Sequence, residues 1–137
     1  MATANVESLR GLRHTPIELR QGMLLAPMAG ESARVVVSNP PYIAQHEAAE
    51  LPASVRDWEP SVALFSGPEG MDATARLVRE AARVLEPGGL LALEVDARRA
   101  SLVVDLVARD GDYRDVAVRL DLTGRERFVL ARRRETE

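Results

Sequence analysis

The sequence predicts an α/β fold: one three-layer domain with helices on the faces of a sheet. Three observations point to it. The chain has 137 residues, about the length of a single domain. Short runs rich in β-branched residues alternate with longer segments of helical periodicity. Proline and glycine stand at the junctions between them, as is typical of alternating strands and helices packed in layers.

Two candidate strands come first. Residues 17–20 (IELR) follow a proline and end at Gln21-Gly22. Residues 34–38 (RVVVS) form a β-branched run that Pro40 stops, which predicts a buried strand. The irregular stretch 43–70 that follows is too long for a simple connection, and loops of this length usually carry function or bind a partner.

Two helices and three strands follow along the chain. A helix is expected from Asp72, because Leu77, Ala81 and Leu85 recur at helical spacing, and Glu86-Pro87-Gly88-Gly89 ends it. The remaining predicted elements are a strand at 90–95, a helix at 100–108 and two strands at 117–122 and 127–131. The last two flank Thr123-Gly124 and are expected to pair antiparallel.

Composition excludes several classes of protein. The net charge of −3 argues against a domain that tracks nucleic-acid phosphates. The absence of cysteine excludes disulfides and thiolate metal sites. No apolar run approaches a membrane span, and the first residues lack the layout of a signal peptide, so we expect a cytoplasmic protein without a membrane partner. His14 and His46 have no ligand partners at metal spacing, and no metal site is predicted.

The segment Asn39-Pro40-Pro41-Tyr42 carries the candidate chemistry. It directly follows the VVV run, so it lies at the carboxyl edge of the sheet, where open α/β sheets bind ligands. The Asn39 side-chain oxygen and the Pro40 carbonyl can accept both hydrogens of an amide or exocyclic NH2 group, and Tyr42 can stack on it. The two prolines keep the loop preorganised. The pattern favours methyl transfer to a planar nitrogen; a plain turn closing the strand is the simpler alternative.

Longer blocks of sequence carry a resemblance to a known family. They are VVVSNPPYIA at 35–44, LPASVRDWEPSVALFSGPEGMD at 51–72, RVLEPGGLLALEV at 83–95 and DLTGRERFVLA at 121–131. The chain resembles the HemK (PrmC) glutamine methyltransferases, which modify peptide chain release factors. The resemblance implies a class I methyltransferase (Rossmann-like) fold, S-adenosylmethionine as donor, and the amide nitrogen of a glutamine in a Gly-Gly-Gln loop as acceptor. Asn39, Pro40, Pro41 and Tyr42 would hold that amide.

The donor side of the family pattern is incomplete. The family binds its donor at a glycine-rich loop after the first strand and an acidic residue after the second. Nothing before Asn39 matches either feature. Leu24 stands where relatives offer a side chain to adenine, so the resemblance leaves Asn39 and Leu24 as donor contacts. We expect residues 1–137 to be the C-terminal portion of a methyltransferase catalytic domain, lacking its first two strands and inactive alone.

The missing strands predict an exposed sheet edge. In the complete fold they lie between the strand at 17–20 and the strand at 34–38. Without them the apolar strand at 34–38 becomes a template for pairing with another chain. We expect either that residues 17–20 move or that two copies dimerise through this edge.

Two other functions stay open at this stage. An N6-adenine or N4-cytosine nucleic-acid methyltransferase grips exocyclic amines with the same motif, but such base-flipping enzymes need a basic DNA-facing surface. The other alternative is a folded, non-catalytic fragment, which the missing glycine-rich half favours.

Overall fold

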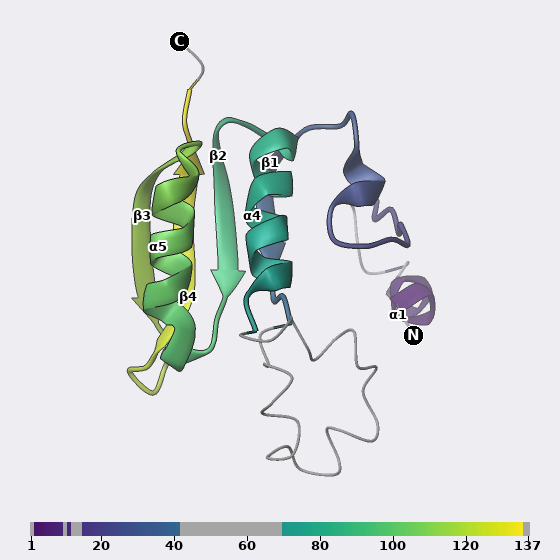
Figure 1. Ribbon diagram of the computed structural model, residues 1–137. Helices are drawn as coiled ribbons and strands as arrows, with labels where there is room; N and C mark the ends of the chain where they lie inside the picture. Colours follow the sequence, from purple (N-terminus) through teal and green to yellow (C-terminus); the bar gives the residue numbers. More distant parts are fainter. Residues whose placement is uncertain (1, 10, 12–14, 42–69, 136–137) are drawn as a thin grey trace.

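The computed structural model describes residues 2–9, 11, 15–41 and 70–135, and Figure 1 shows how their helices and strands are arranged. In chain order the elements are α1 (Ala2–Ser8), the 3-10 turn η1 (Ala26–Met28), β1 (Ala33–Ser38), α4 (Asp72–Val84), β2 (Leu85–Glu94), the 3-10 turn η3 (Ala97–Arg99), α5 (Ala100–Asp110), β3 (Tyr113–Leu120) and β4 (Glu126–Arg133). The strands form one sheet in the order β1-β2-β4-β3. β1 runs parallel to β2, whereas β4 runs antiparallel to both of its neighbours.

The helices follow from the apolar periodicity of their sequences. α4 buries one stripe, made of Leu77, Val78, Ala81, Ala82 and Val84, and α5 buries Ala100, Val103 and Val107. α5 ends at Gly111, whose φ of 85° is a left-handed conformation that glycine adopts without strain. The two predicted helices and the predicted antiparallel pair β3–β4 are confirmed. No helix in the described ranges is long and apolar enough to cross a membrane.

The predicted strand at 17–20 is wrong. These residues are exposed and outside any strand, and Ile17 and Leu19 are each nearly half exposed. None of the described strands pairs with residues 17–20, and β1 pairs only with β2. They lie instead in a loop that Arg20 ties together, since its guanidinium hydrogen-bonds Glu18, Glu31 and the Pro27 carbonyl.

The start of β2 differs from the prediction. Residues 86–89 were expected to end the helix, but the helix stops at Val84 and β2 begins at Leu85. Ala33 of β1 is paired with Leu85 of β2, whereas Val35, two residues later, is paired with Leu90. Regular pairing therefore begins at Leu90, the residue at which the sequence predicts the strand.

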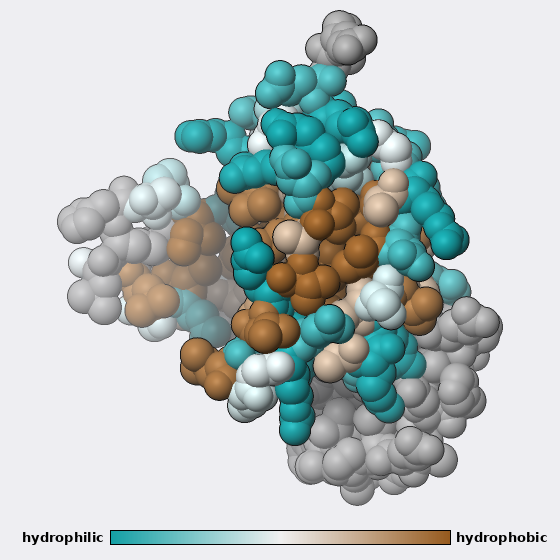
Figure 2. Space-filling view, turned by 90° about the vertical axis from the view of Figure 1, so that its left-hand side faces the viewer, coloured by the Kyte–Doolittle hydropathy of each residue, from teal (hydrophilic) through white to brown (hydrophobic). Residues whose placement is uncertain are grey.

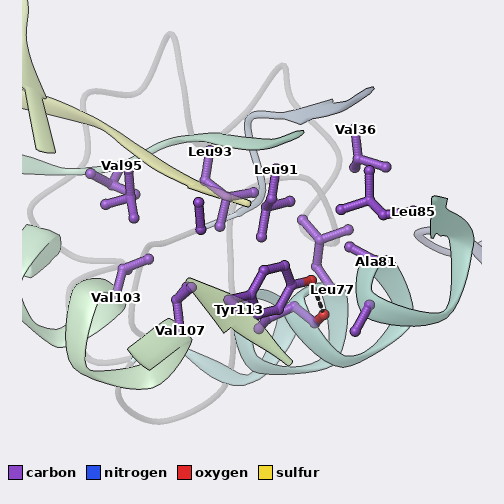
Figure 3. Packing of buried hydrophobic residues seen from close by; sticks show 14 of the residues in the cluster. Val36, Leu77, Ala81, Leu85, Leu91, Leu93, Val95, Val103, Val107 and Tyr113 are labelled. Carbon is purple, nitrogen blue, oxygen red and sulfur yellow. Dashed lines mark hydrogen bonds between the residues drawn. The ribbon is translucent and has the colours of Figure 1, made fainter. Parts of the chain in front are cut away.

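The core lies between one face of the sheet and the helices α4 and α5, which stand in front of the strands in Figure 1. Leu91, Leu93 and Val129 point into it from alternate strand positions. Figure 3 shows Tyr113 among these side chains, and its hydroxyl donates a hydrogen bond of 2.7 Å to the Val78 carbonyl. Burial raises the pKa of Tyr113, so the hydroxyl keeps the proton that it donates.

The opposite face of the sheet carries apolar side chains that the described helices leave exposed. On β1 the core-facing Val36 is 6% exposed, whereas Val35 and Val37, which point the other way, are 51% and 76% exposed. Figure 2, which views the molecule from the left-hand side of Figure 1, shows apolar side chains gathered in the middle of that side, with hydrophilic side chains around them. Among the described residues the layers are therefore two, a sheet and one set of helices, where the sequence predicts three. β1 is an edge strand in this sheet, as the sequence predicts.

Replacing Tyr113 tests how much its buried hydrogen bond to the Val78 carbonyl stabilises the fold. Tyr113→Phe should lower the free energy of unfolding by about 1 kcal/mol, because it removes one buried hydrogen bond while keeping the ring. Urea denaturation measures the change. The matched control is Ser8→Ala, which removes a comparable bond from the exposed Ser8 hydroxyl to the Asn5 carbonyl (2.9 Å) and should change stability by less than about 0.5 kcal/mol. Equal effects for both variants would contradict the role given to Tyr113.

Candidate functional site

The candidate site lies where β1 and β2 end side by side. Their parallel register pairs Val37 with Ala92 and Ser38 with Leu93. One position further along, Asn39 follows the end of β1, and Glu94 is the last residue of β2. A hollow of about 210 Å³ opens between them, lined by Val37, Ser38, Asn39, Ala92, Leu93, Glu94 and Phe128. This is the carboxyl edge of a parallel pair, the place that the sequence predicts for ligand binding.

The structure describes three of the four residues of the predicted motif at 39–42. Asn39 is exposed at the hollow, Pro40 is buried and Pro41 is half-buried. The buried proline fixes the chain immediately after the strand, and the asparagine amide before it stays accessible to a ligand. Tyr42 lies outside the described residues, as do His14 and His46.

The hollow also contains two side chains that the motif did not identify. Glu94 and Phe128 face each other across the β2–β4 register, and Phe128 is 38% exposed. The sequence offered no signal for Phe128, because its place depends on how β4 pairs with β2. Glu94 could be recognised only as the end of a buried strand.

The β3–β4 turn fixes the start of the strand that carries Phe128. The Asp121 carboxylate accepts hydrogen bonds from the Thr123 hydroxyl (2.7 Å), the Thr123 amide (2.8 Å) and the Arg125 amide (3.1 Å). Arg127 donates to the other carboxylate oxygen, and its backbone carbonyl accepts from Val95 at 2.8 Å. These bonds connect the turn to the end of β2.

The hydrogen bonds of this turn also lower the pKa of Asp121. The Thr123 hydroxyl and the Arg125 amide, as hydrogen-bond donors, hold the pKa of Asp121 well below its ordinary value of 3.8. The carboxylate that organises the turn therefore stays ionised throughout the neutral and mildly acidic range.

Leu24 lies in a different part of the molecule. It lines a hollow of about 380 Å³ together with Glu18, Arg20, Pro27, Met28 and Glu31. Its φ of 49° is left-handed, an uncommon conformation for leucine. The next residue is held in place, since the Leu25 amide donates to Glu80 Oε2 of α4 at 3.0 Å.

The described residues do not form a site for S-adenosylmethionine. Asn39 and Leu24, the two donor contacts that the sequence implies, line separate hollows. The donor needs one continuous pocket, which these residues do not form. Within the described ranges, no group of three or more metal-ligating side chains is found either.

Comparison with known proteins finds several similar chains. The chain is 46% identical over 119 residues to a release factor glutamine methyltransferase of Moorella thermoacetica, covering 87% of this chain and 42% of that protein. It is 42% identical over 130 residues to a protein of the same name from Gloeobacter violaceus, covering 95% of this chain and 45% of that one. Over most of its length the chain is therefore similar to proteins named release factor glutamine methyltransferase. This confirms the resemblance carried by the motif blocks.

The chain spans less than half the length of these relatives. No family model matches it. Among solved structures, a methyltransferase from Pyrococcus furiosus superimposes with a TM-score of 0.62 at 18% identity, over 98% of this chain and 56% of that one. At that identity the likeness concerns the fold alone, and it confirms the predicted partial methyltransferase fold.

The Asp121 turn gives a prediction with a defined pH dependence. Because the pKa is lowered on folding, the stabilisation by this carboxylate is present above pH 3.8 and is lost only as the pH falls through the lower folded value. The amide protection factors of Thr123 and Arg125 should therefore hold from pH 7 down to pH 4 in the wild type. Asp121→Asn should reduce them at pH 7 already.

Hydrogen exchange followed by NMR measures these factors. Asp105→Asn, at an exposed acid on α5 (63% exposed side chain), is the control and should leave both amides protected. Wild-type protection in Asp121→Asn would show that the turn does not depend on this carboxylate.

Proposed function

We propose that the whole protein transfers a methyl group to the side-chain amide nitrogen of a glutamine in a peptide chain release factor, within a Gly-Gly-Gln loop. This chain supplies the acceptor side of the site. The observation that carries the proposal is the exposed Asn39 amide beside a hollow at the carboxyl end of a parallel strand pair. The identity of 39–46% to proteins named release factor glutamine methyltransferase supports it.

Methyl transfer to an amide requires that the site orient the amide nitrogen. An amide nitrogen is a poor nucleophile because its lone pair is delocalised into the carbonyl. The Asn39 side-chain oxygen and the Pro40 carbonyl accept its two hydrogens, which turns the lone pair toward the incoming methyl group. The role proposed for Tyr42, which lies outside the described residues, is to stack on the planar amide and exclude water. No strong base is required, since the proton can leave after the methyl group has arrived. The prolines preorganise these acceptors before the substrate binds.

S-adenosylmethionine would supply the methyl group in the complete enzyme. The proposed contacts of this chain are Asn39 and Leu24, but they line separate hollows, so further residues must complete the pocket. We infer that the chain by itself, a C-terminal portion of the catalytic domain, does not turn over. A cytoplasmic location stays part of the proposal.

We also propose that the isolated chain forms a homodimer through the free edge of β1. The edge is apolar, with Val37 76% exposed and Val35 51% exposed, and the backbone groups on that side of β1 have no strand partner among the described residues. Exposed edges of this kind pair readily with another strand.

Light scattering tests the dimer. The wild type should have twice the 15.0 kDa mass of one chain, and Val37→Lys should shift it to a monomer, because lysine on an edge strand opposes pairing. Leu122→Lys, at a fully exposed residue of the β3–β4 turn, is the control and should remain dimeric. A monodisperse wild-type monomer would rule out pairing through this edge.

The activity is tested in a chimera, in which this chain replaces the matching 42% of the Moorella thermoacetica relative. Methyl transfer from labelled S-adenosylmethionine to a release factor should occur. Asn39→Ala should slow it by about 100-fold or more, which corresponds to at least ~2.7 kcal/mol for loss of one oriented hydrogen-bonding group.

Asn5→Ala, at an exposed asparagine of α1, is the matched control and should keep full activity. An adenine-containing oligonucleotide serves as the competing acceptor and should not be methylated. Wild-type rates from Asn39→Ala would contradict the role of Asn39, and methylation of the oligonucleotide alone would contradict the substrate.

A further inference from the structure

The hollow beside Asn39 carries one ionisable side chain, that of Glu94. The other residues lining it are apolar or neutral. Within the described part of the chain, no hydrogen bond or ion pair is found for the Glu94 side chain, which is half-buried. A carboxylate in this position presents hydrogen-bond acceptors and a negative charge to whatever enters the hollow.

Two arginines of the neighbouring strands, Arg119 and Arg127, make no ion pair with Glu94. Arg119 is opposite Phe128, and Phe128 is opposite Glu94, so Arg119 lies two strands away from the carboxylate. Two strand spacings put the backbones of Arg119 and Glu94 roughly 10 Å apart. Arg127 is paired with Asp121 and the Val95 carbonyl.

Phe128 gives the hollow an apolar wall beside this charge. Together with Val37 and Ala92 it can cover the methylene groups of an extended side chain. The polar atoms, Asn39 and Glu94, come from the ends of two neighbouring strands. The hollow therefore combines an apolar wall with acceptor groups at one end, which suits a short aliphatic stem that ends in N–H donors.

We propose that Glu94 is a specificity-determining residue of the acceptor site, which makes the hollow bind a glutamine side chain and reject a glutamate. This inference rests on the proposed function and adds to it the basis of amide selection. A glutamine side chain is neutral, so it meets no repulsion from Glu94 while Asn39 and Pro40 accept its two N–H groups. A glutamate brings a second negative charge and no donor, and the described residues that line the hollow include no cation to compensate. Selectivity then comes from a repulsive element as well as an attractive one.

The test is a pair of binding titrations on this chain at pH 7, followed by backbone amide NMR. The probes are the peptides acetyl-Gly-Gly-Gln-amide and acetyl-Gly-Gly-Glu-amide. The wild type should bind the glutamine peptide at least about tenfold more tightly, with shifts at Asn39, Glu94 and Phe128. Glu94→Gln should bring the two affinities within about threefold of each other, because it removes the charge but keeps the shape.

Glu86→Gln is the matched control. It makes the same substitution at the exposed opposite end of β2, outside the hollow, and should keep the wild-type preference. Unchanged thermal unfolding of Glu94→Gln shows that the comparison concerns folded protein.

The titrations distinguish a failure of the role proposed for Glu94 from a failure of the proposed function. If the wild type prefers the glutamine peptide and Glu94→Gln keeps that preference, the role of Glu94 is overturned and the proposed function stands. If neither peptide shifts the residues of the hollow, both the acceptor site in this chain and the role of Glu94 are overturned.

Discussion

The parallel pairing of β1 with β2 is the constraint on which the rest of the structure depends. Residues 86–89 bulge out of the ladder before regular pairing starts at Leu90. Gly89 allows this, because a Cβ there would lie 2.8 Å from the Glu86 carbonyl oxygen and 3.1 Å from that of Arg34. Once Val37 is set against Ala92, side chains alternate between two faces. One face buries Val36, Leu91 and Leu93 under the helices, and the other leaves a hollow at the strand ends.

The same alternation links packing with function. Core residues on β2 and β4, such as Leu93 and Val129, hold the strands in register, and their outward neighbours Glu94 and Phe128 line the hollow. The turn organised by Asp121 then fixes where β4 begins. The candidate site is thus built on rigid strands, which position side chains more precisely than loops do.

Much of this could be predicted from the sequence where local patterns decide the structure. The β-branched run before Asn39 predicts β1, and the stripe from Leu77 to Ala81 predicts α4. The short segment 17–20 also has a strand-like pattern, but a strand needs a neighbour to pair with, and the pattern carries no information about that. The position of Phe128 could not be predicted for a related reason, since the register between distant strands is set by tertiary packing. Tyr42 lies outside the described residues, and its role stays a prediction.

A disulfide crosslink tests the register between β1 and β2 most directly, and the chain has no cysteine to interfere. In the double variant Val37→Cys with Ala92→Cys, the two residues are Cα partners on one face, so oxidation should link them without loss of fold. Val37→Cys with Leu93→Cys places the second thiol one residue along, on the opposite face, and should not crosslink. A crosslink in this shifted pair, with none in the first, would contradict the register and with it the meeting of Asn39 and Glu94 at one hollow.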